Sequence, residues 1–149
     1  MSKNSRDSTD TSGLRHISPI EAHQRLQHRP RDLLIDIRST MEHLFIGHPV
    51  GSVHVPWIDE PDWTVNPQFV PQVRKLLLGG VADHGEDAPA VYLICRSGKR
   101  SESAGQALVE AGIEHVYSVD EGFEGPLDDN HQRSNRGGWR YHGLPWEQC

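Results

Sequence analysis

A short loop in the second half of the chain combines a cysteine with cations and a glycine. It reads Cys-Arg-Ser-Gly-Lys-Arg-Ser over residues 95–101. Consecutive backbone N–H groups in such a loop can converge on one point and form a nest that binds an anion. A helix N-terminus and nearby Lys or Arg side chains lower the pKa of a cysteine thiol from its usual value of roughly 8.5. We therefore expect Cys95 to be ionised at neutral pH and to bind or attack a small anionic substrate.

The elements on either side of the loop would present Cys95 at one edge of a sheet. Residues 90–94 form an unbroken apolar run, which is typical of a central parallel strand covered on both faces. Residues 101–111 place alanine and leucine at helical spacing, and Gly112 ends that helix. The alternative is a buried structural cysteine. That alternative explains Cys95 but not the cations beside it.

Helices and strands alternate along the rest of the chain. Ser18 caps a helix over residues 18–28, and Glu21 completes its capping box. Further strands are predicted at residues 32–37, 52–55 and 115–119, and further helices at 40–46 and 66–78, ended by Gly47 and by Gly79-Gly80. This alternation predicts an α/β fold with a central parallel sheet flanked by helices on both faces. Ligands bind such sheets outside the carboxyl ends of the strands, where Asp36, Cys95 and Asp120 would lie.

The length of the chain indicates how many domains it forms, and its net charge indicates which classes of partner to exclude. The 149 residues suggest one domain, with residues 1–12 as a disordered tail and residues 13–149 as the folded unit. Residues 124–149 should form an irregular extension packed on that unit. The net charge of -6 argues against nucleic acid and against an anionic membrane surface as partners. No apolar run approaches the ~20 residues of a membrane helix.

The cysteines and histidines indicate whether disulfides and a metal site are to be expected. The two cysteines, Cys95 and Cys149, are too few for a disulfide framework, and residues 1–13 have no apolar core of the kind a secretion signal requires. We therefore expect a reducing, cytoplasmic setting with free thiols. The ten histidines are scattered without zinc-site spacing, so we expect no metal and no cofactor.

Four segments, in this order, make the chain resemble the rhodanese family of sulfurtransferases over residues 14–125. They are Asp36-Ile37-Arg38 with Glu42, residues 47–56, residues 95–101 and residues 119–123. The resemblance implies a parallel α/β sheet and a nucleophile, Cys95, that accepts a sulfane sulfur as a persulfide. The donor would be thiosulfate or another persulfide, and the acceptor cyanide, a thiol or a carrier protein.

The same resemblance assigns the loop to substrate binding. Its N–H groups would surround the sulfur, its cations would contact the thiosulfonate anion, and its serines would support the loop and cap the next helix. The residues involved are Arg96, Ser97, Gly98, Lys99, Arg100 and Ser101.

Loop length separates the rival chemistries. Four residues lie between Cys95 and Arg100, whereas cysteine phosphatases use a loop one residue longer, and Ser101 stands where their arginine would be. The shorter loop favours a sulfur atom over a phosphate. A phosphatase or arsenate reductase remains the alternative reaction, and a sulfur-relay module with low turnover remains the alternative role.

Residues before the loop are expected to support it. Arg38 should pair with Glu42 at helical spacing, while Asp36 caps the loop backbone. Direct roles in catalysis are the alternative for Asp36 and Arg38. His48 should be a buried, hydrogen-bonded loop histidine, with an acid or base as its alternative role.

Two further features have alternative interpretations. The tryptophans at positions 57, 63, 139 and 146 should pack irregular segments onto the domain, or else form a docking surface for the acceptor. Cys149 could resolve the persulfide by forming a disulfide with Cys95. As a terminal residue, however, it is expected to be frayed.

Overall fold

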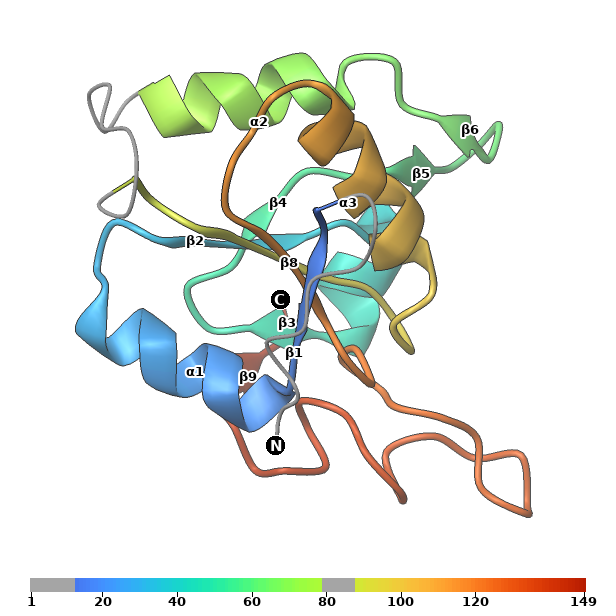
Figure 1. The fold of residues 1–149 in the computed structure, drawn as a ribbon. Coiled ribbons are helices and arrows are strands. Elements are labelled where there is room, and N and C mark those ends of the chain that lie inside the picture. The colour runs from blue at the N-terminus through green and yellow to red at the C-terminus, as the bar shows by residue number, and fades with distance from the viewer. Residues whose placement is uncertain (1–12, 79–87) are drawn as a thin grey trace.

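The computed structural model describes residues 13–78 and 88–149 (Figure 1). The predicted tail at residues 1–12 and the Gly79-Gly80 helix terminator lie outside the described residues. A five-stranded sheet, parallel in every pairing, forms the centre of the fold. Its strands, in spatial order, are β1 (Arg15–Ile17), β8 (Val116–Val119), β7 (Val91–Ile94), β2 (Leu33–Asp36) and β4 (Val53–His54). The predicted central parallel sheet is therefore confirmed.

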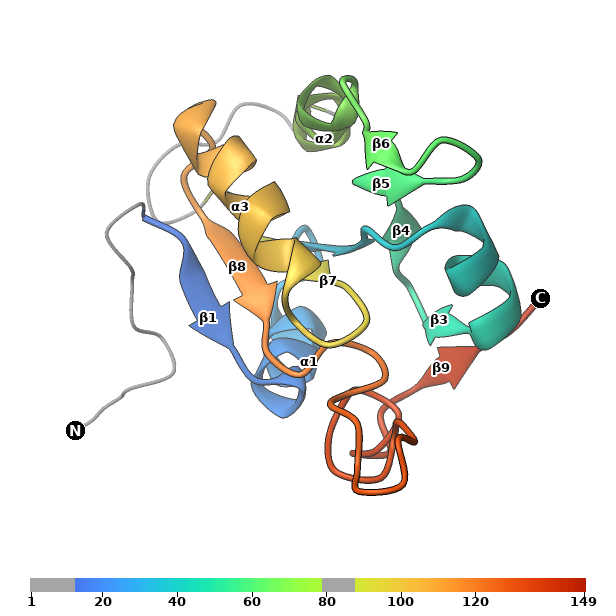
Figure 2. The same cartoon turned by 90° about the vertical axis from the view of Figure 1, so that its right-hand side faces the viewer.

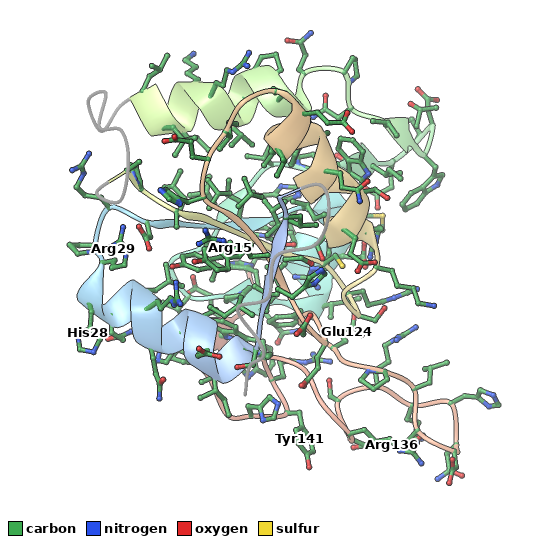
Figure 3. The ribbon with its side chains drawn as sticks, viewed as in Figure 1. Arg15, His28, Arg29, Glu124, Arg136 and Tyr141 are labelled. Atoms are coloured by element: carbon green, nitrogen blue, oxygen red, sulfur yellow. The ribbon has the colours of Figure 1, made fainter. Side chains whose placement is uncertain are left out.

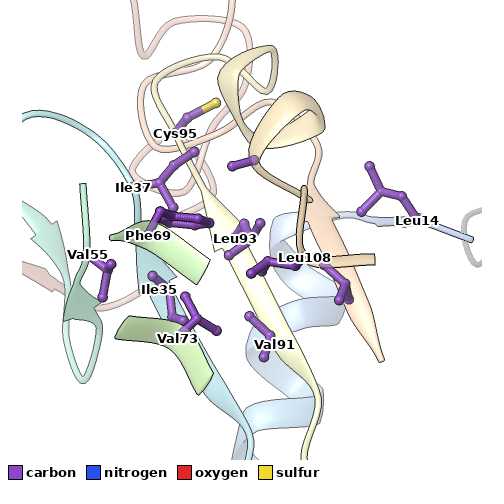
Figure 4. Packing of buried hydrophobic residues seen from close by; sticks show 12 residues of the cluster. Leu14, Ile35, Ile37, Val55, Phe69, Val73, Val91, Leu93, Cys95 and Leu108 are labelled. Atoms are coloured by element: carbon purple, nitrogen blue, oxygen red, sulfur yellow. The ribbon is translucent and has the colours of Figure 1, made fainter. Parts of the chain in front are cut away.

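Helices cover both faces of this sheet, as predicted (Figure 2). They are α1 (Pro19–His28), α2 (Phe69–Leu78) and α3 (Arg100–Glu110). Side chains from α2 and α3 pack with one set of strand residues, which includes Ile35 and Leu93 (Figure 4). Ala22 of α1 packs with the opposite set, which includes Leu34 and Tyr92. Successive strand residues thus enter different cores, which explains why the strands read as continuous apolar runs.

Strand β7 carries the strongest sequence signal and occupies the centre of the sheet. All four of its residues are buried, and it pairs with β2 on one side and β8 on the other. The cap of α1 also forms as expected, because the Glu21 N–H donates to Ser18 Oγ over 3.1 Å. The local sequence was therefore sufficient to predict both strand β7 and the N-terminal cap of α1.

Several short elements differ from the sequence prediction. Strand β1 was not predicted, since Arg-His-Ile is too short and too polar to show a strand period and exists by pairing with β8. The helical stretch expected at 40–46 is a π-helix, η2 (Glu42–Ile46), followed by Gly47 at φ 113°. Two small antiparallel pairs were also missed: β3 (His48–Pro49) with β9 (Trp146–Glu147), and β5 (Ile58–Asp59) with β6 (Thr64–Val65).

The C-terminal segment folds back across the domain next to the carboxyl ends of the strands (Figure 1). Trp139 is buried in the α1-side core and donates from Nε1 to the Pro145 carbonyl. Trp57 contacts Phe69 edge-on, and Trp146 does the same with Phe123. Trp63 differs from the packing expected of it, because 54% of its surface is exposed.

In the described part of the chain, no helix is both long enough and apolar enough to cross a membrane.

Candidate active site

Cys95 directly follows β7, and its sulfur points away from the packed core toward the next loop and the start of α3 (Figure 4). Two main-chain amides donate to Sγ: Gly98 N–H over 3.2 Å and Ser101 N–H over 3.4 Å. The cysteine is 1% exposed. Fixed N–H dipoles aimed at a sulfur stabilise the negative charge that develops on it during a displacement. Gly98 can turn its amide inward because its φ of 103° is accessible to glycine.

A buried pair of serines lies beside the sulfur. Ser101 Oγ is 3.5 Å from Sγ and 2.6 Å from the hydroxyl of Ser118 on β8. Ser118 is fully buried and was missed by the sequence analysis. Its signal was a hydroxyl in the middle of an otherwise apolar strand, Val-Tyr-Ser-Val. A second hydroxyl behind Ser101 fixes the orientation of the one that contacts the cysteine.

The cations of the loop divide into two kinds. Arg100 forms a two-pronged ion pair with Glu42 of η2, with both N···O distances 2.9 Å. Burial alone would lower the pKa of Arg100, but the bonded carboxylate outweighs burial and raises it. The resemblance implied that Arg100 contacts a substrate anion, yet the structure provides it with a protein carboxylate. Arg96 and Lys99, by contrast, are exposed at the surface.

The predicted pairing of Arg38 with Glu42 is wrong. The fully buried guanidinium of Arg38 donates instead to both carboxylate oxygens of Asp36, over 2.9 and 2.8 Å, and to the Gly47 carbonyl. Asp36 also accepts the Arg38 backbone N–H over 3.0 Å, which is the backbone-capping contact expected of it. A buried arginine needs a buried carboxylate, and Asp36 at the end of β2 supplies one.

Three histidine rings stack against this ion pair. His43 lies in the middle, with ring centroids 3.9 Å from His48 and 4.4 Å from His54. Its Nδ1 donates to Asp36 over 2.7 Å, while His48 donates from Nδ1 to the His43 carbonyl over 2.8 Å. The face-to-face rings tie η2, β3 and β4 together. Among the described residues, no three His, Cys, Asp or Glu side chains gather in a way that could hold a metal ion.

The ion pair between Asp36 and Arg38 makes the free energy of unfolding depend on pH. Burial raises the pKa of Asp36, but the hydrogen bonds from His43 and Arg38 outweigh burial and lower it from 3.8 to about 2. A carboxyl whose pKa is depressed on folding adds stability above its unfolded pKa and loses that contribution as the pH falls toward its folded pKa. Asp36 should therefore contribute about 2 kcal/mol at neutral pH, lost between about pH 4 and pH 2.

Urea unfolding of the wild type and of Asp36→Asn, at pH 6 and again near pH 2.5, measures this contribution. The asparagine of the variant cannot titrate, while all other groups are common to both proteins. The difference in the free energy of unfolding should shrink by about 2 kcal/mol in acid. A difference that is independent of pH would show that Asp36 keeps an ordinary pKa.

The turn after β8 is joined to the cysteine loop by backbone hydrogen bonds. The Phe123 N–H donates to the Cys95 carbonyl over 2.7 Å, and the Glu124 N–H donates to the Arg96 carbonyl over 2.9 Å. Gly122 makes this close approach possible: it has φ 67°, and a Cβ there would lie 2.5 Å from the Cys95 carbonyl oxygen. The sequence analysis did not assign Gly122 or Glu124 a role at the site.

Known proteins share the fold of this chain. The crystal structure of Rv0390 from M. tuberculosis is 36% identical, with a TM-score of 0.75 over 90% of this chain and 97% of that one. The solution structure of the polysulfide-sulfur transferase homodimer from Wolinella succinogenes shares the fold, at 22% identity and a TM-score of 0.57 over 93% of this chain and 81% of that one.

Among curated proteins, the uncharacterized RP600 homolog of Rickettsia rickettsii is 23% identical over 90% of this chain and 98% of its own length. The family model for the rhodanese-like domain matches residues 18–127, from the cap of α1 to just beyond the turn after β8. With the parallel sheet, the cysteine at the end of β7 and most of the chain included in that match, the protein belongs to the rhodanese-like domain family.

Proposed function

We propose that this protein is a sulfurtransferase that carries a sulfane sulfur on Cys95. The donor is thiosulfate or a persulfide, and the acceptor is a thiophile such as cyanide, a thiol or a carrier protein. The observation that supports the proposal most strongly is the environment of Sγ. Two main-chain N–H groups converge on a sulfur at the carboxyl end of the central strand. Such donors stabilise a thiolate nucleophile and the charge left on a sulfur leaving group.

The reaction divides into two balanced displacements. The Cys95 thiolate attacks the outer sulfur of thiosulfate, the bond between the two thiosulfate sulfurs breaks, and sulfite departs with the electron pair. The product is a Cys95 persulfide. The acceptor then attacks the outer persulfide sulfur, and the electron pair of the broken bond returns to Sγ.

The cations of the loop have separate roles in these two displacements. The exposed Arg96 and Lys99 side chains attract the anionic donor to the loop. Arg100, paired with Glu42, holds the end of the loop in place. The four residues between Cys95 and Arg100 favour sulfur over phosphate as the transferred group.

Intact mass tests the proposal directly. After incubation with thiosulfate or a small persulfide, the wild type should gain the mass of one sulfur atom and release it when cyanide is added, with thiocyanate as the product. Cys95→Ser should neither gain the sulfur nor form thiocyanate, while Cys149→Ser, the control, should do both. Thiocyanate formation by Cys95→Ser would overturn the mechanism, as would a wild type that no donor loads. Stoichiometric loading with slow thiocyanate release would identify a relay.

A further inference from the structure

Glu121, in the turn after β8, has a backbone conformation that glutamate rarely adopts. Its φ is 68°, and Gly122 follows with φ 67°. Two successive residues of this turn are therefore left-handed, although the first of them carries a side chain. A left-handed residue with a Cβ is unfavourable, and it persists only where the surrounding structure holds it in place. The contacts of Glu121 identify what holds it.

The C-terminal segment binds the side chain of Glu121. Its Oε1 accepts a hydrogen bond from the Gly138 N–H over 2.8 Å and another from His142 Nε2 over 2.9 Å. Both donors belong to one turn, since the His142 N–H donates to the Gly138 carbonyl over 3.1 Å. Tyr141, which meets the His142 ring edge-on, lies at the outer surface of this turn (Figure 3). Two hydrogen bonds to one carboxylate oxygen fix the position of the Glu121 side chain.

The C-terminal segment also approaches the turn closely with its backbone. A Cβ at Gly137 would lie 2.5 Å from Oε1 of Glu121, so a larger residue there would displace the carboxylate. The Trp139 N–H donates to the Gly122 carbonyl over 2.9 Å. This main-chain bond aligns the segment with the turn, while the Glu121 side chain fixes the residue before Gly122.

The backbone of Glu121 faces the cysteine loop. A Cβ at Gly98 would lie 3.2 Å from the Glu121 nitrogen. The same Gly98 donates its N–H to Cys95 Sγ over 3.2 Å. Figure 2 shows the turn after β8 between the cysteine loop and the C-terminal segment. A shift of the Glu121 backbone would therefore be passed on to an amide that contacts the sulfur.

We propose that Glu121 is a positioning residue for sulfur transfer. Its carboxylate, bound by Gly138 and His142, holds the turn after β8 in the left-handed conformation that sets the Gly98 amide against Sγ. The C-terminal segment thereby becomes part of the framework of the active site. Glu121 acts through Gly98 and not on the sulfur itself. The inference rests on the proposed sulfurtransferase function, because that reaction is what the Gly98 amide assists.

Three substitutions at position 121 separate the hydrogen bonds from the backbone conformation. Glu121→Gln keeps an acceptor oxygen for both donors and should load sulfur at a rate within about threefold of the wild type. Glu121→Gly removes the acceptor, but glycine adopts φ 68° freely, so this variant should remain folded and load sulfur about tenfold more slowly. Glu121→Ala removes the acceptor and keeps the unfavourable conformation, so it should lose stability as well as rate.

Single-turnover loading of Cys95 by thiosulfate, followed by intact mass, measures these rates. In Glu121→Gly the limiting rate should fall, while the half-saturating thiosulfate concentration should stay within about twofold of the wild-type value. The reason is that the exposed Arg96 and Lys99, which attract the donor, are unchanged. The amide NMR signal of Gly98 should shift in Glu121→Gly and keep its wild-type position in Glu121→Gln. Urea unfolding shows whether each variant is folded.

Glu147→Ala is the matched control. Glu147 also belongs to the C-terminal segment and also lies beside a histidine, with its Oε2 3.4 Å from Nε2 of His48. It is part of β9, however, and its side chain is 55% exposed. Its removal should leave the limiting rate and the Gly98 signal unchanged.

The outcomes separate this inference from the proposed function. If the wild type loads sulfur and Glu121→Gly loads it at the same limiting rate, the positioning role is wrong and the sulfurtransferase function stands. The same conclusion follows if Glu121→Gln or Glu147→Ala loads sulfur as slowly as Glu121→Gly. If no donor loads the wild type, both proposals are wrong.

Discussion

Gly122→Ala is expected to lose sulfur transfer by about a hundredfold and to destabilise the protein by about 3 kcal/mol. A Cβ at position 122 would lie 2.5 Å from the Cys95 carbonyl oxygen and 2.6 Å from the Arg96 carbonyl carbon. Both are backbone atoms, so no side chain can rotate away to relieve the clash. The turn after β8 must separate from the cysteine loop, which shifts the amides that face Sγ. Persulfide transfer rates and urea unfolding measure the two effects.

Gly112→Ala is the matched control for this change. Gly112 also has a positive φ, at 95°, but a Cβ there would meet no atom within 4 Å. Alanine at position 112 therefore carries only the conformational cost, about 1 kcal/mol, and should leave sulfur transfer intact. If the two variants lost activity to the same extent, contact between the β8 turn and the cysteine loop would not be what positions the sulfur.

Asp36→Ala is expected to reduce the free energy of unfolding by about 3–5 kcal/mol. The change leaves the guanidinium of Arg38, which has no exposed surface, without a carboxylate. It also removes the acceptor of His43, the central ring of the histidine stack. Since uncompensated buried charge costs more than a lost hydrogen bond, Arg38 should account for most of the loss. Urea unfolding at neutral pH provides the measurement.

The double variant Asp36→Ala/Arg38→Met distinguishes charge from packing. Removing the orphaned guanidinium should recover part of the stability lost by Asp36→Ala, because a methionine at position 38 fills a similar volume without charge. The double variant would still lack the hydrogen bond to the Gly47 carbonyl, so recovery should be incomplete. A double variant as unstable as the sum of the two single changes would show that Asp36 and Arg38 do not stabilise each other.

The sequence by itself determined the features that depend on neighbours along the chain. The apolar run before Cys95 predicts a buried strand, and the helical pattern after it predicts α3, so the loop between them had to lie at the carboxyl edge of the sheet. The Ser18 cap is local in the same way. Periodicity and capping act over a few residues, and a short stretch of sequence contains all of that information.

Tertiary structure decided which distant groups meet. Arg100 and Glu42 are 58 positions apart, and no spacing rule joins them. Arg38 had a carboxylate at helical spacing, yet burial beside Asp36 selected the other partner. Ser118 and the turn at Gly122 likewise acquire their roles from a strand and a loop brought together by the sheet. Because charges attract through space, and more strongly when buried, the tertiary structure determines which ion pairs form.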